Sequence, residues 1–173
     1  FAEFTQGLYQ TPEQINSSTL RTVTQTIEFL GSLMKERGLA QFKDPAKAHV
    51  YVVDDDEENC HCIQLALQQQ MMRTSISQDP SLALMELAGG RYDLIMLDVS
   101  MPGMDGFALC KSIRELPLHA NTPVVFLTGL STIENRVQST LCGGNEFIAK
   151  PFSLNELSVK VLSLILRSEL AGN

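Results

Sequence analysis

The chain has 173 residues, of which 44% are hydrophobic and 19% are charged, and its mean hydropathy is +0.02. This composition is typical of a globular protein and excludes a disordered or collagen-like chain. A formal net charge of -7 leaves no basic surface for a phosphate backbone, so we expect no direct binding to nucleic acid. The apolar stretch 157–166 contains polar residues and is shorter than the roughly 18–20 residues of a membrane span, so we expect no membrane insertion.

The chain begins with Phe1 rather than Met and lacks the pattern of a signal peptide, which indicates a fragment of a longer protein. Its four cysteines are scattered and lack the spacing of a zinc site. We therefore expect reduced, mostly packed thiols and a cytoplasmic location. The cysteines are Cys60, Cys62, Cys110 and Cys142.

A helix is predicted near the N-terminus. Thr11-Pro12-Glu13-Gln14 has the form of a capping box with proline at the first helical position, and Gly38 supplies a stop. The helix could therefore reach about 26 residues. A charged, proline-containing stretch at Lys43-Asp44-Pro45 then predicts a boundary between a helical extension, residues 1–45, and a main domain, residues 46–173.

Apolar residues in the predicted helix recur at alternating spacings of three and four, as in a two-heptad seam. Two interpretations are open. The helix could pack this apolar stripe on the following domain, or it could pair with another helix in a dimer or transmit a signal from an upstream module. The weak helix formers Asn16 to Thr19 also allow a break. The apolar stripe consists of Leu20, Val23, Ile27, Leu30 and Met34.

Downstream, short apolar runs alternate with helical patterns. The runs are rich in β-branched and aromatic residues, which is typical of strands buried on both faces. Five alternations with short, right-handed connections predict an α/β fold with a five-stranded parallel sheet and helices on both faces. The predicted strands are 48–53, 72–76, 93–97, 124–127 and 147–149, and the predicted helices are 57–70, 79–87, 106–116, 131–141 and 153–170.

Polar residues follow four of these strands. Asp54 and Asp55 follow the first, Asp98 the third, Thr128 the fourth and Lys150 the fifth. Because the carboxyl ends of parallel strands meet at one edge of a sheet, we expect these side chains to converge. Three carboxylates would repel one another there unless cations compensate them. Lys150 supplies one cation, and Mg²⁺ is the natural second because it prefers carboxylate and water oxygens.

Such a site suits phosphate chemistry, in which a carboxylate acts as a nucleophile and forms an aspartyl phosphate. Asp98 is the better candidate because it stands alone, whereas Asp54 and Asp55 are adjacent and can share a cation. Each residue alone also has a structural explanation, such as a helix cap, a turn or a solvated lysine. Together, four strand ends that present complementary groups favour a functional site.

Four segments resemble the motifs of the receiver domains of two-component response regulators, in the same order and with similar spacing. The resemblance covers about residues 46–170 and implies a flavodoxin-like sheet with strand order 2-1-3-4-5. The segments are Val52-Val53-Asp54-Asp55-Asp56, Leu97-Asp98-Val99-Ser100-Met101-Pro102-Gly103-Met104-Asp105-Gly106, Leu127-Thr128-Gly129 and Phe147-Ile148-Ala149-Lys150-Pro151-Phe152.

The resemblance assigns the acidic residues. It implies that Asp98 is the phospho-acceptor and that Asp54 and Asp55 are the acidic pair that binds Mg²⁺ together with Asp98. It also implies that Ser100 lends its backbone carbonyl to the metal.

The resemblance also assigns the residues that respond to the phosphoryl group. Thr128 and Lys150 are implied to contact it, and Phe147 to be a switch aromatic that moves inward as Thr128 shifts. A cis peptide bond is implied between Lys150 and Pro151. Leu130 is apolar where many members of the family are polar, so we hypothesise an altered lifetime of the acyl phosphate.

The function implied is a phosphorylation-dependent switch without turnover of an external substrate. A histidine kinase or a histidine phosphotransfer protein would phosphorylate Asp98, and the surface formed by 131–141, 147–149 and 153–170 would change. A homodimer could form through this surface or through the N-terminal helix. Two alternatives are an aspartate-nucleophile phosphohydrolase, in which the position of Ser100 is usually acidic, and a receiver-like interaction module without phosphorylation.

Overall fold

The structure, a computed structural model, describes residues 5, 6, 8, 9, 15, 17–35, 47–129 and 133–171. Strands and helices alternate along the main domain as the sequence predicts. The elements are α2 (Ser17–Lys35), β1 (His49–Val53), α3 (Glu57–Gln69), β2 (Arg73–Ser77), α4 (Pro80–Gly89), β3 (Leu94–Asp98), α5 (Gly106–Arg114), β4 (Val124–Thr128), α6 (Ile133–Leu141), β5 (Glu146–Ala149) and α7 (Leu154–Ala171).

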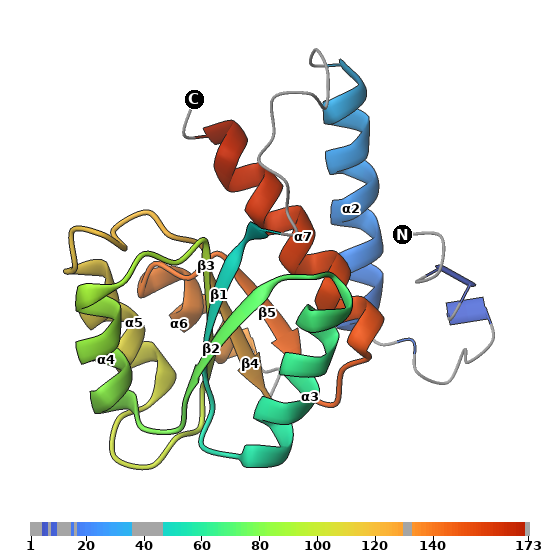
Figure 1. Cartoon of the computed structure of the whole chain (residues 1–173). Coiled ribbons are helices and arrows are strands. Elements are labelled where there is room, and N and C mark those ends of the chain that lie inside the picture. Colours follow the sequence, from blue (N-terminus) through green and yellow to red (C-terminus); the bar gives the residue numbers. More distant parts are fainter. Residues whose placement is uncertain are drawn as a thin grey trace.

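The five strands form one parallel sheet in the order β2-β1-β3-β4-β5 (Figure 1). This confirms the predicted fold class and strand order. The central strands β3 and β4 are buried along their whole length, whereas four of the five residues of β2 are at least partly exposed. The weak apolar pattern of β2 is therefore that of an edge strand.

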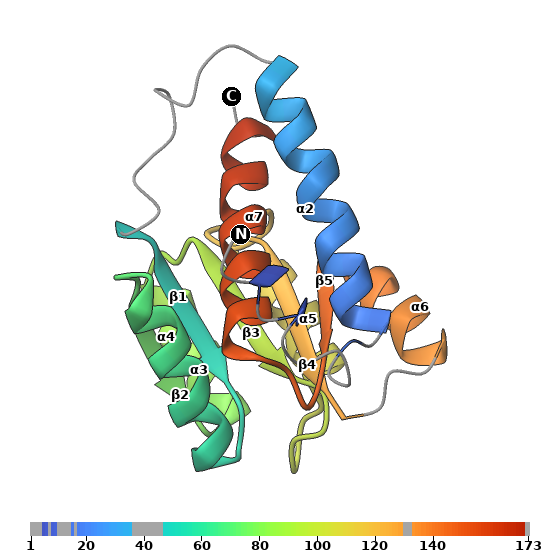
Figure 2. The ribbon, with the colours of Figure 1, turned by 90° about the vertical axis from the view of Figure 1, so that its right-hand side faces the viewer.

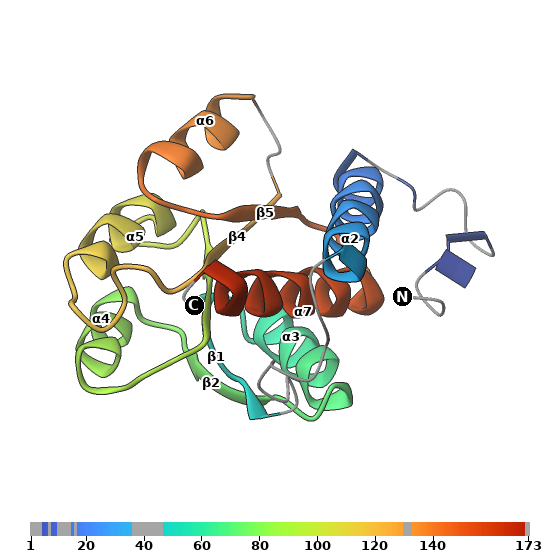
Figure 3. The same cartoon turned by 90° about the horizontal axis from the view of Figure 1, so that it is seen from above.

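Helices cover both faces of the sheet. Viewed from above, α3 and α7 lie on one face, and α4 and α5 lie on the other (Figure 3). Two apolar cores fill the space between the layers, and each combines alternate residues of the strands with one pair of helices. No helix in the described part of the chain is long and apolar enough to cross a membrane.

Aspartates cap three of the helices at the ends of the loops that follow β1, β2 and β3. The carboxylates of Asp56, Asp79 and Asp105 accept hydrogen bonds from backbone N–H groups in the first turns of α3, α4 and α5. Such caps satisfy N–H groups that have no partner within the helix. They fix the points at which the chain leaves the carboxyl edge of the sheet and turns into a helix.

The N-terminal helix is shorter than the predicted maximum. Helix α2 has 19 residues, and Ile15 before it is not helical. The helix therefore does not run unbroken from the predicted capping box at 11–14. That box, the stop at Gly38 and the domain boundary after residue 45 lie outside the described residues.

Helix α2 packs against α7 and β5, but not through its apolar stripe (Figure 2). Leu20, Ile27 and Leu30 are 58%, 56% and 41% exposed. These three of the five predicted stripe residues contradict the interpretation in which the stripe packs on the domain, whereas Val23 is half-buried and the side chain of Met34 lies outside the described part of the chain. Among the α2 side chains whose burial the structure describes, the buried ones are Thr19, Thr22 and Thr26, called the threonine face below, together with Phe29.

Substitution of Gly106, at the start of α5, is predicted to have a large effect on stability. A Cβ atom there would lie 2.1 Å from the backbone oxygen of Asp98 and 3.1 Å from the Cα atom of Val99. We expect Gly106→Ala to lower the free energy of unfolding by about 1–3 kcal/mol or more, because backbone atoms must move apart. Urea denaturation measures this change.

Gly89→Ala is the matched control, because a Cβ atom at Gly89, the last residue of α4, would meet nothing within 4 Å. Its free energy of unfolding should stay level or rise by up to about 1 kcal/mol. Equal stability of the two variants would contradict the close packing of α5 under Asp98.

Candidate functional site

The predicted convergence of strand ends is present. Strand register pairs Val53 with Leu97, so Asp54 and Asp98 follow at the same level of neighbouring strands β1 and β3. Thr128 ends β4, and its backbone oxygen accepts a 2.7 Å hydrogen bond from the backbone N–H of Lys150. Four segments far apart in the sequence thus meet at the carboxyl edge of the sheet.

Lys150 joins the two buried carboxylates. Its Nζ atom lies 2.7 Å from Oδ2 of Asp54 and 2.6 Å from Oδ1 of Asp98. Asp54 is fully buried and Asp98 is 5% exposed. Burial lowers the pKa of the Lys150 ammonium, but its hydrogen bonds to Asp54 and Asp98 outweigh burial and raise this pKa above its usual value. The ammonium thus stays charged and compensates two carboxylates at once.

The other oxygens of the two carboxylates are held by the loops that follow the strands. Oδ1 of Asp54 accepts hydrogen bonds from the backbone N–H of Asp56 and from Nδ2 of Asn59, at 3.1 and 3.3 Å. Oδ2 of Asp98 accepts a 2.7 Å hydrogen bond from the backbone N–H of Ser100. These contacts fix the orientation of each carboxylate. A carboxylate that is held in this way presents its oxygens to a cation or an electrophile in a fixed direction.

Two further residues belong to the site and were not predicted. Asn59, in the first turn of α3, binds the carboxylate of Asp54, and the Cys60 thiol donates to the Asp54 backbone oxygen over 3.2 Å. Burial, followed by nearby aspartates, raises the pKa of Cys60 to about 11. The thiol is therefore protonated at neutral pH and holds the backbone rather than acting as a nucleophile. Only the early position of Asn59 and Cys60 on the helix after Asp54 could have indicated this.

The remaining predicted residues lie around this centre. Asp55 and Ser100 are exposed beside it, and Thr128 is 1% exposed at its base. The ring of Phe147 is buried in the core beside α5, with 4% exposure, so it already lies inside in this structure. The peptide bond between Lys150 and Pro151 is cis, which confirms that prediction. The hypothesis on Leu130 falls outside the described residues.

The donor set fits a hard divalent cation. Within the described residues, no three acidic, histidine or cysteine side chains form a ready metal cluster. Asp54 and Asp98 nevertheless offer carboxylate oxygens held together by one ammonium, beside the exposed Asp55. Mg²⁺ is commonly bound by one or two carboxylates and keeps several waters, so a complete protein cage is not needed.

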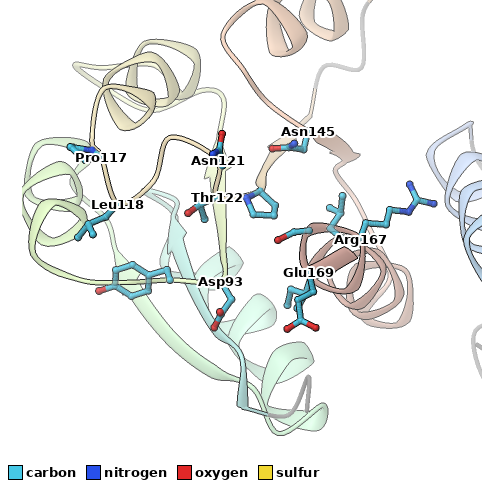
Figure 4. Close-up of a pocket in the computed structure, with 13 residues that line it drawn as sticks. Asp93, Pro117, Leu118, Asn121, Thr122, Asn145, Arg167 and Glu169 are labelled. Carbon is cyan, nitrogen blue, oxygen red and sulfur yellow. The ribbon is translucent and has the colours of Figure 1, made fainter. Parts of the chain in front are cut away.

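A large cavity lies at the opposite edge of the sheet (Figure 4). Its volume is about 860 Å³, and it is lined by residues that precede β3, β4 and β5 and by the last turns of α7, including Asp93, Asn121, Asn145 and Arg167. None of the four converging strand-end residues lines it. This cavity and the charged centre are thus separate features.

Curated relatives are response regulators of greater length. The chain is 36% identical over 117 residues to the response regulator PleD of Caulobacter vibrioides, which covers 68% of this chain and 26% of that protein. It is 38% identical over 114 residues to the transcriptional regulatory protein SpaR of Bacillus subtilis, which covers 66% of this chain and 50% of that protein. The chain thus spans about a quarter to a half of the length of these relatives.

Solved structures show the same fold. The chemotaxis protein CheY4 of Vibrio cholerae superposes with a TM-score of 0.66 at 29% identity, over 69% of this chain and 99% of that one. The receiver domain of the sensor histidine kinase PA1611 of Pseudomonas aeruginosa, solved with a magnesium ion in its active-site cleft, gives 0.64 at 26% identity, over 69% and 98%. The profile of the response regulator receiver domain matches residues 50–162, and the chain therefore belongs to this family of two-component signalling switches.

Proposed function

We propose that Asp98 is the phospho-acceptor of this receiver domain and that Lys150, Thr128 and Mg²⁺ assist the transfer. The observation that carries the proposal is the Lys150 ammonium, which lies within 2.7 Å of Asp54 and 2.6 Å of Asp98. A buried carboxylate beside a fixed cation is both a nucleophile and a place where added negative charge is compensated.

The transfer step uses one carboxylate oxygen of Asp98. This oxygen attacks the phosphorus of a phosphohistidine on a partner protein, and a P–O bond forms while the P–N bond breaks. The electron pair of the broken bond stays on the imidazole nitrogen, which takes a proton from water. Hydrolysis of the aspartyl phosphate later returns the carboxylate and releases inorganic phosphate.

Asp54, Asp55, Asp98 and the backbone carbonyl of Ser100 would hold Mg²⁺ beside this oxygen. When bound, Mg²⁺ supplies positive charge next to the phosphoryl oxygens. Asn59 keeps the Asp54 carboxylate in place through its 3.3 Å hydrogen bond, so that this member of the acidic pair is oriented before any ligand arrives. That receiver domains take Mg²⁺ is supported by the related PA1611 domain.

The proposed output is a change on one side of the sheet. Thr128 and Lys150 would bind the phosphoryl oxygens. Thr128 is the last residue of β4, and Lys150 directly follows the edge strand β5. Their movement would reposition Phe147 and the surface formed by α6, β5 and α7. A small local change can shift such a surface when it has two packed arrangements.

The proposed partners follow from this chemistry. A histidine kinase or histidine phosphotransfer protein would supply the phosphoryl group, in the cytoplasm, and membership of the receiver family argues against a phosphohydrolase. We also propose that residues 1–45 are an extension that precedes the receiver domain. Two copies would associate through the apolar stripe of α2, because its exposed residues are spaced as in a symmetric two-helix seam.

Phosphorylation is tested by intact mass spectrometry after incubation with acetyl phosphate. We expect one phosphoryl adduct that requires Mg²⁺ and is absent from Asp98→Asn. The control is Asp93→Asn, the same change at the other end of β3, where the carboxylate accepts a hydrogen bond from the backbone N–H of His49. An adduct that persists in Asp98→Asn would place the phosphoryl group on another residue, and no adduct in any of the proteins would favour a receiver-like module without this chemistry.

The bridging role of Lys150 predicts a metal-dependent stability. Removing the ammonium leaves two buried carboxylates uncompensated, so Lys150→Met should lower the free energy of unfolding by about 2 kcal/mol without Mg²⁺. We expect added Mg²⁺ to stabilise this variant more than the unaltered chain, because the cation relieves the repulsion.

Thermal unfolding with and without Mg²⁺ measures both effects. Lys47→Met removes the same charge from an exposed position just before β1, at the opposite end of the strands. Its thermal stability should match that of the unaltered chain. If Lys150→Met were as stable as the Lys47 variant without Mg²⁺, the ammonium would not be holding the two carboxylates together.

The proposed dimer is tested by replacing either of two exposed leucines with aspartate. Leu20 on the apolar stripe and Leu141 on α6 are 58% and 79% exposed. Leu20→Asp should raise the dissociation constant of the dimer at least about tenfold, a cost of about 1.4 kcal/mol, and Leu141→Asp should leave it unchanged. Sedimentation velocity over a range of concentrations measures both. Dissociation by Leu141→Asp alone would place the dimer on the α6-β5-α7 surface instead.

A further inference from the structure

The surface expected to carry the output is partly covered by this chain's own helix. Helix α2 runs beside α7 in the same direction and contacts β5 (Figures 2 and 3). Near its start, the hydroxyls of Thr19 and Thr22 donate to the carboxylate of Glu156 over 3.2 and 3.3 Å. Further along, Arg167 of α7 donates to the backbone oxygen of Gln25.

The interface of α2 with the domain is mostly polar. Of the described side chains of α2, it buries the threonine face and Phe29, over which the Arg167 guanidinium lies 5.2 Å from the ring centroid. A cavity of about 10 Å³ remains between α2, β5 and α7. Hydrogen bonds exchanged for water contribute little net stability, so this docking is weaker than that of an apolar helix face of equal length.

The carboxylate of Glu146 connects the α2 interface with the backbone of Phe147, the expected switch residue. Oε1 of Glu146 lies 3.4 Å from Nη2 of Arg21 on α2 and accepts a 3.0 Å hydrogen bond from the N–H of Phe147. The same oxygen lies 3.7 Å from Nζ of Lys160, which donates to the backbone oxygen of Phe147 over 2.9 Å. Both backbone polar groups of Phe147 are thus bound to groups at the α2 interface.

The other end of this strand reaches the acidic centre. Lys150 follows β5 directly, three positions after Phe147, and its ammonium binds Asp98. A continuous path therefore leads from Asp98 through Lys150 and β5 to Glu146 and Arg21. The path consists of ion pairs and one four-residue strand. Contiguous contacts of this kind can couple the position of Lys150 to that of Glu146.

We propose that α2 is the intramolecular partner of the β5-α7 surface and that phosphorylation of Asp98 weakens its docking. This inference rests on the proposed function. The contacts of α2 belong to the state in which Lys150 bridges two free carboxylates. A phosphoryl group on Asp98 draws the ammonium toward its own oxygens, moves β5 with it, and separates Glu146 from Arg21. Release of α2 uncovers the surface for a protein partner.

Hydrogen exchange of the full chain, read by mass spectrometry, tests the release. After phosphorylation with acetyl phosphate and Mg²⁺, amides of α2 should exchange at least about fivefold faster, whereas those of α4 on the opposite face should be unchanged. The experiment is run in the Leu20→Asp background, so that pairing of two copies does not protect the helix.

Two variants test whether the ion pair between Arg21 and Glu146 couples α2 to phosphorylation, or whether any loss of an arginine raises the exchange of α2. Arg21→Gln should show fast exchange of α2 before phosphorylation and a smaller further increase. Arg91→Gln, which removes an exposed arginine from the loop before β3, should behave like its parent.

The outcomes of the proposal and of the proposed function are distinguishable. A complete phosphoryl adduct with unchanged or slower exchange of α2 would overturn the release of α2 and leave the phosphorylation of Asp98 intact. An equal response in Arg21→Gln would overturn the role of the Glu146 junction. Absence of the adduct would overturn both the proposed function and this inference.

Discussion

The ion pairs of Lys150 are the constraint on which the rest of the site depends. Two carboxylates at neighbouring strand ends, one of them fully buried, repel each other unless a cation lies between them. Lys150 follows β5, two strands from β3 and three from β1 in a sheet whose strands lie about 4.8 Å apart. The long side chain of Lys150 extends past the end of β4, and its Nζ atom contacts both acids.

The same strand carries a second buried charge arrangement. Lys160 of α7 and Glu146 of β5 are 2% and 5% exposed, and they meet at the backbone of Phe147. An edge strand of four residues has few ladder hydrogen bonds to hold it, and its open side must be covered. Here ion pairs fix β5 from both ends, and α2 contacts it from outside. Phe147 and Ile148 also pack in the two apolar cores, so β5 is held by apolar packing in its middle and by charged contacts at both ends.

The fold and the centre of the site could be predicted because their signals are local. Apolar runs buried on both faces indicate β1, β3 and β4, and the polar residue after each run falls at one edge of a parallel sheet. Asn59 and the threonine face could not be predicted in this way. Thr19 binds Glu156 across 137 positions of sequence, and its pattern on α2 carries no apolar signal. The helical period indicates that the apolar residues share one face of α2. It does not indicate which face packs against the domain.

Helix α2 therefore has two faces of opposite chemistry, and only one of them is covered by the domain. Burial of threonines and an ion pair gains little over their solvation, whereas exposure of the apolar stripe forgoes roughly 25 cal/mol for each Å² that a partner could cover. The docked arrangement is thus not the one that buries the most apolar surface of α2. A helix held mainly by charges is released when those charges are redistributed, and it then presents its apolar stripe without the constraint of the domain. The polar interface allows α2 to leave the domain, and the exposed apolar stripe allows it to bind elsewhere. In the proposed switch, the charge at Asp98 controls the change between these two states.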